Sequence, residues 1–368
     1  MCELTPSTVA RVQPTAPCAV HPPTTLTNAN AEALHVAVAV IRDGNGRVLV
    51  SRRSHYVEQG GLWEFPGGKL LAGETPLAGL TREIEEELGI TVKSTIPLIK
   101  IRHAYVERTV LLDVWEVWAW DGKPYGREAQ EVTWLREDAL CEFDFPAANA
   151  PIITALSLPR VCLITPEPYA KRAFLDDLEL SLQHGVSLVQ LRAKNLSYAA
   201  YRDIARDALT ICRSHRTRLI INSATQIARE IGADGVHLTA DDLQRHTVRP
   251  LPPSSLVSAA CHQAADLARA ERLGVDFALL SPVKPTPTHP HARALGWPLT
   301  KEIVATTTLP VFALGGMDPT DLIEAVSNNC IGIAGIRSLW CSAHDVSASY
   351  VRELLFKGKD KFGLKQPA

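Results

Sequence analysis

Eight short apolar runs recur between residues 161 and 335, and their spacing most constrains what this chain can fold into. Helix-forming stretches such as 201–215 and 263–272 lie between most of them. Short strands that alternate with helices over roughly 200 residues are typical of an α/β fold, the (β/α)8 or TIM barrel. A doubly wound dinucleotide-binding sheet is disfavoured, because no glycine-rich turn follows the first run. The runs are VCLIT (161–165), LVQLR (188–192), RLIIN (218–222), GVHL (235–238), LVSAA (256–260), FALLS (277–281), PVFAL (310–314) and IGIAG (331–335).

At 368 residues the chain is longer than most single domains, so we expect two. Residues 158–160, which contain a proline, are the best candidate for the link between them. We expect a disordered extension rich in Thr, Pro and Ala, two folded domains and a short tail. The extension is residues 1–30, the two domains are residues 31–157 and 160–357, and the tail is residues 358–368.

Composition narrows the class of partner. The net charge is −2, and Arg52-Arg53 stands without a longer basic tract, so we expect a free nucleotide rather than a nucleic-acid groove. The eight cysteines are dispersed without a C-x-x-C pair, as is typical of a reduced, cytoplasmic protein. No apolar run approaches the length of about 18 residues that indicates a membrane span. The sequence is compatible with a homo-oligomer.

The second informative segment is acidic. Residues 68–90 read GKLLAGETPLAGLTREIEEELGI, and Glu83, Glu86 and Glu87 fall at i, i+3 and i+4 of a predicted helix. Like charges at this spacing repel, so a solvated acidic face has to tolerate a cost in helix stability. The alternative is a site for Mg²⁺ or Mn²⁺, because these ions prefer carboxylate and carbonyl oxygen.

The same segment resembles the signature of the Nudix hydrolases, G-x5-E-x7-R-E-U-x-E-E-x-G-U with U aliphatic, at every fixed position. This resemblance implies an α/β/α sandwich with a mixed sheet, and a Mg²⁺- or Mn²⁺-dependent pyrophosphohydrolase. It implies that Arg82 orients the glutamates, whereas the base that activates water stays open among Glu83, Glu86 and Glu128. The metal-binding residues would be Gly67, Glu83, Glu86, Glu87 and Glu128.

Three further segments are similar to the MutT type of Nudix hydrolase: LWEFPGGK (62–69), GREAQEVTW (126–134) and FPAANAPI (145–152). The resemblance implies hydrolysis of 8-oxo-dGTP and other oxidised purine nucleoside triphosphates to the monophosphate and pyrophosphate, in the service of DNA repair and replication fidelity. Asn149 would bond to the base edge and Arg53 would approach the nucleotide. The expected substrate-binding residues are Arg53, Glu64, Phe65, Tyr105 and Asn149. Another Nudix substrate, such as a dinucleoside polyphosphate or ADP-ribose, is the alternative, because the signature is shared.

The second half resembles thiamine phosphate synthase and its relative TenI through HGVSLVQLRAK (184–194), LIIN (219–222), IGADGVHL (231–238) and ALGG (313–316). Gln190, Arg192 and Lys194 alternate, so we expect them to point the same way along an extended segment. The resemblance implies that a thiamine-precursor phosphate binds at the carboxyl ends of the strands. The expected ligand-binding residues are Gln190, Arg192, Lys194, Asn222, Asp242, Gly315 and Gly316.

Two departures from that family bear on its activity. Ser223 stands where the synthase has a metal-binding Asp, although the partner acid is present as Asp242, and His289 stands where it has a lysine. Losing one acid and one cation weakens metal binding and stabilisation of the leaving group, so we do not expect full synthase activity. A TenI-like isomerase, a ligand-binding module that regulates the Nudix half and a stabilising partner domain stay open.

Overall fold

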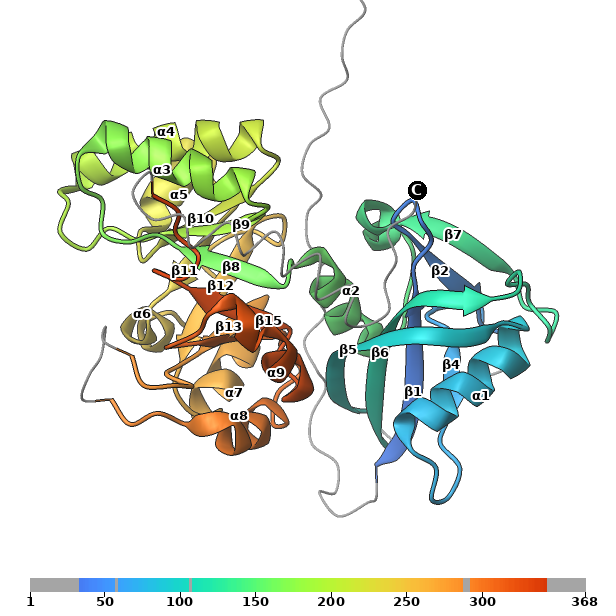
Figure 1. Ribbon diagram of the computed structural model, residues 1–368. Coiled ribbons are helices and arrows are strands. Elements are labelled where there is room, and N and C mark those ends of the chain that lie inside the picture. The colour runs from blue at the N-terminus through green and yellow to red at the C-terminus, as the bar shows by residue number, and fades with distance from the viewer. Residues whose placement is uncertain (1–32, 57–58, 106–107, 287–291, 343–368) are drawn as a thin grey trace, which may run out of the picture.

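The computed structural model describes two folded domains in tandem (Figure 1). It covers residues 33–342 with the exception of 57–58, 106–107 and 287–291. Three predictions lie outside the described residues: the extension over 1–30, the tail over 358–368, and His289. No helix in the described part of the chain is long and apolar enough to cross a membrane.

The N-terminal domain contains two sheets and confirms the predicted mixed α/β fold. One has the order β4-β1-β6-β5, in which β1 and β6 run parallel and the other pairs are antiparallel. The other is antiparallel, in the order β3-β2-β7. Helix α1 packs against β1, β4 and β5. The elements are β1 (Leu34–Ile41), β2 (Arg47–Arg52), β3 (Trp63–Glu64), β4 (Gly67–Lys69), α1 (Pro76–Leu88), β5 (Thr91–Ala104), β6 (Thr109–Asp121), β7 (Val132–Arg136), η1 (Glu137–Glu142), η2 (Ala147–Asn149) and α2 (Ala150–Ser157).

Strands β1 and β2 join through a tight turn in which the Asp43 carboxylate accepts from the Asn45 and Arg47 backbone N–H groups at 2.9 and 2.8 Å. The residues of this turn are typical of a β-hairpin. Strands β1 and β2 do not pair with each other, however, and the two segments are joined only by the bridge between Arg42 and Val48. Beyond it, β1 lies between β4 and β6 whereas β2 lies between β3 and β7. Pairing with strands from farther along the chain therefore overrides the local signal.

The C-terminal domain is a closed parallel barrel, and all eight predicted runs form its strands, β8 to β15. Alternate side chains point inward, where Leu188, Ile220 and Leu256 meet Phe277 and Phe312 in one apolar cluster. The elements are β8 (Val161–Ile164), α3 (Lys171–Gln183), β9 (Leu188–Leu191), α4 (Tyr198–Ser214), β10 (Arg218–Asn222), α5 (Thr225–Ile231), β11 (Gly235–Leu238), α6 (Ala240–Arg245), β12 (Leu256–Cys261), α7 (Ala264–Leu273), β13 (Phe277–Leu280), α8 (Gly296–Val304), β14 (Val311–Leu314), η3 (Pro319–Asp321), α9 (Leu322–Ser327) and β15 (Gly332–Gly335).

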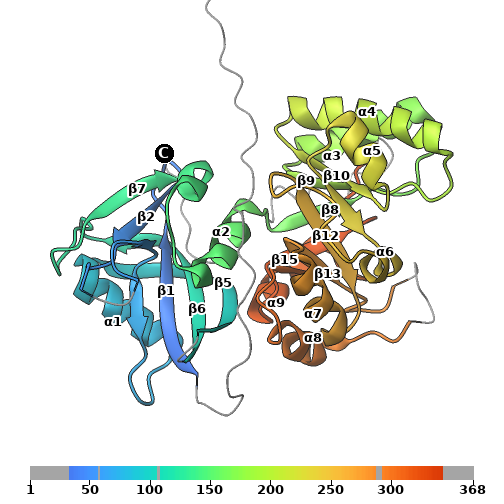
Figure 2. The ribbon, with the colours of Figure 1, turned by 180° about the vertical axis from the view of Figure 1, so that it is seen from behind.

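The two domains meet at the amino ends of the barrel strands (Figures 1 and 2). Arg160, directly before β8, pairs with Glu116 in β6. Arg218, the first residue of β10, donates to the carbonyl of Ser157 at the end of α2. Helix α9 packs beside β5. The carboxyl ends of the barrel strands, where such barrels bind ligands, consequently face away from the N-terminal domain.

Candidate active site

A cavity of about 320 Å³ lies in the N-terminal domain between β1, β6 and the segment before α2. All five residues predicted to bind the nucleotide line it, together with two of the predicted metal-binding residues. Those lining residues are Arg53, Glu64, Phe65, Gly67, Glu87, Tyr105 and Asn149. Glu83, Glu86, Glu128 and Arg82 are not part of the lining.

Sequence reasoning missed the apolar wall of this cavity. Leu34, Val36 and Val38 of β1 and Val110 and Leu112 of β6 supply it. The signal was present, because residues at every second position of a strand share one face. The intervening residues of β1 pack instead in the cluster that lies beneath α1.

Helix α1 presents the acidic residues in a fixed orientation. The Thr75 side chain accepts from the Ala78 backbone N–H at 3.3 Å to begin the helix, and Gly89 ends it with a left-handed φ of 66°. Leu80 and Ile84 are fully buried against the sheet. That buried stripe turns the helix so that its glutamates face the β4 strand and solvent.

Two glycines allow the helix and β4 to approach closely. The Gly67 backbone N–H donates to Glu87 Oε2 at 3.1 Å. A Cβ at Gly68 would overlap the carboxylate of Glu83, so a side chain there requires Glu83 or the helix to move. The glycines of the Pro66-Gly67-Gly68 sequence therefore place two carboxylates directly against the strand.

The charge of this cluster is not balanced. Burial raises the pKa of Glu87 to about 8; the Gly67 hydrogen bond opposes the shift, and repulsion from Glu64, Glu83 and Glu128 adds to it. Carboxylates held together in this way form a hard, anionic donor set that suits Mg²⁺ or Mn²⁺. Binding a divalent cation would relieve the repulsion.

Arg82 ties the acidic residues together. Its guanidinium donates to Glu83 Oε1 at 2.8 Å and to Glu86 Oε2 at 3.0 Å. It also donates to both oxygens of Glu74, at 3.0 and 2.9 Å. Within the described residues no three His, Cys, Asp or Glu side chains form a ready metal site. Cation binding thus requires Glu83 and Glu86 to exchange Arg82 for the metal.

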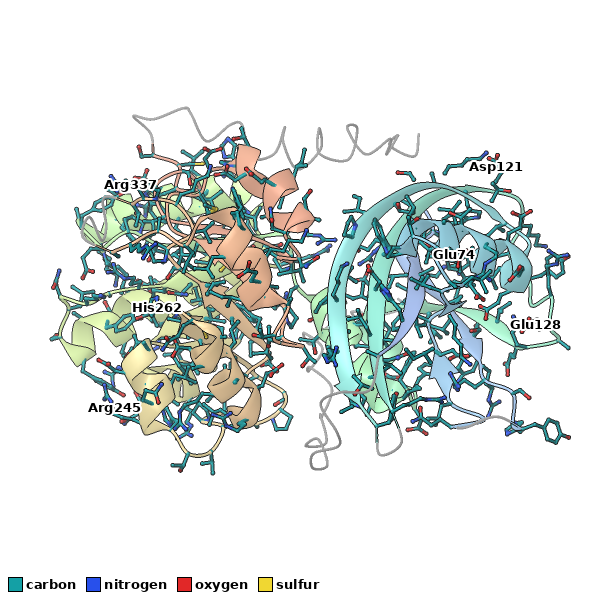
Figure 3. The ribbon with its side chains drawn as sticks, turned by 90° about the horizontal axis from the view of Figure 1, so that it is seen from below. Glu74, Asp121, Glu128, Arg245, His262 and Arg337 are labelled. Carbon is teal, nitrogen blue, oxygen red and sulfur yellow. The ribbon has the colours of Figure 1, made fainter. Side chains whose placement is uncertain are left out.

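The segment after β6 is anchored to the end of α1. The Arg127 backbone N–H donates to the Glu87 carbonyl at 2.9 Å, and Gln130 Nε2 donates to the same carbonyl at 3.1 Å. Gln130 Oε1 accepts from the Glu128 backbone N–H at 2.8 Å. Glu128 itself is exposed, on the side of the domain far from the barrel, as Figure 3 shows. Its anchored backbone keeps this carboxylate near the helix.

The other end of the cavity carries an unpaired acceptor. Asn149 is 9% exposed, and its Oδ1 atom has no hydrogen-bond donor among the described residues. Phe65 stacks on Phe145 with ring centroids 5.4 Å apart beside it. Arg53 pairs with Glu64 in the cavity wall, where burial raises the pKa of the glutamate against the effect of the arginine. A buried oxygen without a donor costs about 1–3 kcal/mol, which suggests that a ligand satisfies it.

The predicted barrel residues lie at or just beyond the carboxyl ends of β9, β10, β11 and β14, with Asp242 in α6. Asn222 Nδ2 donates to Gln190 Oε1 at 2.9 Å inside the barrel. Of the three residues predicted to point the same way, Gln190 lies in β9, whereas Arg192 and the exposed Lys194 follow its end at Leu191. Their common direction stays a prediction. Gly315 and Gly316 follow β14 with φ of 94° and 65°.

Comparison with known proteins agrees with this two-part construction. A family model described as NUDIX domain matches residues 37–155, and one described as thiamine monophosphate synthase matches residues 161–339. The 8-oxo-dGTP diphosphatase of Escherichia coli is 37% identical over 123 residues, which span 33% of this chain and 95% of that protein. The corresponding enzyme of Haemophilus influenzae is 37% identical over 33% of this chain and 90% of its own length. The putative thiamine-phosphate synthase 2 of Aquifex aeolicus is 34% identical over 181 residues, 49% of this chain and 97% of that protein.

The fold and the acidic helix define a Nudix hydrolase joined to a TIM barrel. The chain belongs to the Nudix family through its N-terminal domain, which is related to MutT, and to the thiamine phosphate synthase/TenI family through its C-terminal domain.

Proposed function

We propose that the N-terminal domain hydrolyses oxidised purine nucleoside triphosphates, 8-oxo-dGTP above all, to the monophosphate and pyrophosphate. The observation that carries this proposal is the orphaned Oδ1 atom of Asn149 in a cavity with apolar walls. An 8-oxopurine carries a proton on N7, whereas plain guanine carries a lone pair there. The orphaned oxygen can accept from the oxidised base, and it would face a second acceptor in the normal one.

The remaining residues have complementary tasks. Tyr105 and the apolar residues of β1 and β6 would pack against the faces of the base, and Arg53 would approach the sugar or the phosphates. The phosphates would then extend toward Gly67 and Glu87, at the other side of the cavity. With the nucleotide in this orientation, the reacting phosphorus would lie beside helix α1, whose carboxylates repel one another unless a cation binds.

Gly67, Glu83, Glu86, Glu87 and Glu128 are the residues that would hold Mg²⁺ or Mn²⁺. When bound, such an ion neutralises phosphate charge and lowers the pKa of a coordinated water. Until a cation binds, Arg82 would hold the carboxylates of Glu83 and Glu86 in place. A glutamate that does not bind the cation would accept the proton of the water. The general base stays open among Glu83, Glu86 and Glu128.

Steady-state kinetics with Mg²⁺ on 8-oxo-dGTP, dGTP and ADP-ribose test the proposal. For the wild type we expect kcat/KM to favour 8-oxo-dGTP over dGTP by about 10⁴, the scale on which a site rejects an analogue that leaves its polar groups unpaired. Glu86→Gln should lower the hydrolysis of both substrates by about 100-fold or more. Asn149→Ala should instead remove the preference while dGTP hydrolysis persists.

Other outcomes distinguish the substrate from the chemistry. Equal rates on 8-oxo-dGTP and dGTP would refute the base assignment but leave a Nudix hydrolase. Faster hydrolysis of ADP-ribose would move the assignment to that substrate class, with the barrel as the regulatory half.

A further inference from the structure

The loop after β10 contains a hydrogen-bonded cluster at the position where the synthase family holds its metal. Ser223 Oγ donates to Asp242 Oδ2 at 2.6 Å. The Thr239 hydroxyl and the Thr239 backbone N–H lie 2.7 and 3.2 Å from the same oxygen. Asp242 returns a bond by donating its own backbone N–H to the Thr239 hydroxyl at 3.2 Å, which completes the capping box of α6. The Asp242 carboxylate therefore stabilises the start of helix α6.

The second carboxylate oxygen is also near a donor. Arg245 Nη2 lies 3.8 Å from Asp242 Oδ1, so a fixed positive charge stands beside the acid (Figure 3 labels Arg245). Ser223 has a hydroxyl where the synthase has a carboxylate, so one negative charge is absent. Arg245 offsets the charge of Asp242, the acid that remains. Mg²⁺ needs several oxygen ligands in octahedral geometry, with carboxylates among them. The residues present do not fit the metal of the family.

The backbone at Ser223 has a conformation that also suits aspartate, the metal-binding residue of the synthase at this position. Its φ of 57° lies in the left-handed region, which Asn, Asp and Gly tolerate better than other residues. The side chain is directed at Asp242 by this conformation, so an acid at this position would stand beside a second acid. The residue type at position 223, rather than its backbone conformation, therefore disfavours a metal here.

Other polar groups for a ligand are present at this end of the barrel. Gln190 is 2% exposed and faces the barrel interior, and its Nε2 atom has no acceptor within the described ranges. Arg192 lies half-buried with its guanidinium 4.0 Å from Glu167. Gly315 and Gly316 lie in the loop after the seventh strand, one of the places where TIM barrels bind phosphate.

The charge at this end suits a small anion. Lys284 is paired with Asp321, and Arg192 is near Glu167, so two of the cations are partly offset by acids. A pyrophosphate group carries more negative charge than a monoester and depends on added cations for its neutralisation. A phosphate monoester carries less charge, so these partly offset cations can bind it without a divalent cation.

We infer that the C-terminal barrel binds a phosphate monoester without a divalent cation, because Ser223 has taken the place of the second acidic metal ligand. The barrel accordingly retains its ligand and does not catalyse a metal-dependent transfer of a pyrophosphate ester. Figure 3 shows His262 and Arg337 in the barrel, and Glu74 and Glu128 in the N-terminal domain. This inference does not depend on the function proposed for the Nudix half.

Manganese binding by the full chain tests the metal half of the inference. The Nudix glutamates are first neutralised in a Glu83→Gln/Glu86→Gln background, so that differences at residue 223 report the barrel. In this background we expect no Mn²⁺ bound in the barrel with Ser223, by electron paramagnetic resonance. Ser223→Asp should create a Mn²⁺ site, and Ser223→Asn should not. Asp and Asn share size and tolerance of the left-handed backbone, so the pair isolates the charge.

Titration with inorganic phosphate and pyrophosphate tests the ligand half. We expect phosphate binding to be unchanged between Mg²⁺ and EDTA, lost in Arg192→Ala, and retained in Arg53→Ala, which affects only the Nudix cavity. A Mn²⁺ site with Ser223 that disappears in Asp242→Asn would overturn the inference. So would failure of Ser223→Asp to gain Mn²⁺, phosphate binding that requires Mg²⁺, or no phosphate binding in the barrel.

Discussion

Arg160, at the start of the barrel, pairs with Glu116 in the middle of the Nudix sheet, and this carboxylate is 4% exposed. The same glutamate also accepts from Arg42 Nε at 2.9 Å. Arg160→Ala leaves the buried acid with one partner, so we expect a loss of about 2–4 kcal/mol in the free energy of unfolding. Urea unfolding should then separate into two transitions, because the mutation removes one of the bonds that cross the domain interface.

Two probes can resolve that separation. Five of the seven tryptophans lie in the Nudix half, so fluorescence reports mainly that half, whereas far-ultraviolet circular dichroism reports both halves. Arg172→Ala is the matched control, since its side chain is 91% exposed and its ion pair with Asp176 lies within α3. Coincident curves in Arg160→Ala, as in the control, would show that the arginine does not couple the domains.

Gly68→Ala tests the close approach of β4 and α1. The added Cβ overlaps the Glu83 carboxylate, so the helix or the glutamate has to move. A displacement of this size at a catalytic constellation costs about 100-fold in rate, and we expect kcat/KM to fall by that factor. Gly44→Ala is the control, because nothing lies within 4 Å of its added Cβ. Full activity in Gly68→Ala would show that Glu83 is not held against the strand during catalysis.

Much of this molecule was predictable from the sequence, for identifiable physical reasons. The barrel strands are short, buried on both sides and separated by helices, so each apolar run has a single interpretation. The acidic helix carries its own start at Thr75 and stop at Gly89, so its ends were readable. The apolar wall of the cavity, by contrast, required the sheet order. It forms because β1 pairs with β6, which places Leu34 opposite Val110, 76 positions farther along the chain.

Other features depend on contacts that no local pattern encodes. The unpaired oxygen of Asn149 and the cluster of Ser223 with Asp242 arise from residues brought together by the fold. The same holds for Arg160, which the sequence suggests only as part of a link. Pairing across the sheet likewise decided the course of β1 and β2 after their turn.

His237 gives the barrel a pH-dependent stability. It is 4% exposed, its Nδ1 lies 2.9 Å from Ser258 Oγ, and burial lowers its pKa to about 4, although Asp242 acts in the opposite direction. The folded protein keeps this imidazole neutral, whereas the unfolded chain binds a proton below about pH 6.5. Stability is therefore complete above pH 6.5 and declines as the pH falls toward 4, by about 3 kcal/mol.

Urea unfolding at pH 7, 6 and 5 measures this decline, and His237→Gln should flatten it. His262→Gln, at an exposed position, should leave the slope as in the wild type. An unchanged slope in His237→Gln would assign the acid sensitivity to another group.

Tyr201→Phe tests how the barrel positions its ligand loops. The buried hydroxyl lies 2.7 Å from the Leu191 carbonyl and 3.1 Å from the Asn222 carbonyl, so it joins the ends of β9 and β10 directly before Arg192 and Ser223. Its loss leaves those carbonyls without this donor, and we expect about 1–2 kcal/mol less stability and weaker phosphate binding. Tyr198→Phe, which loses an exposed bond to Glu230, is the control. If Tyr201→Phe loses stability but binds phosphate as before, the hydroxyl supports the fold alone; if both decline together, the two strand ends act as one ligand-holding unit.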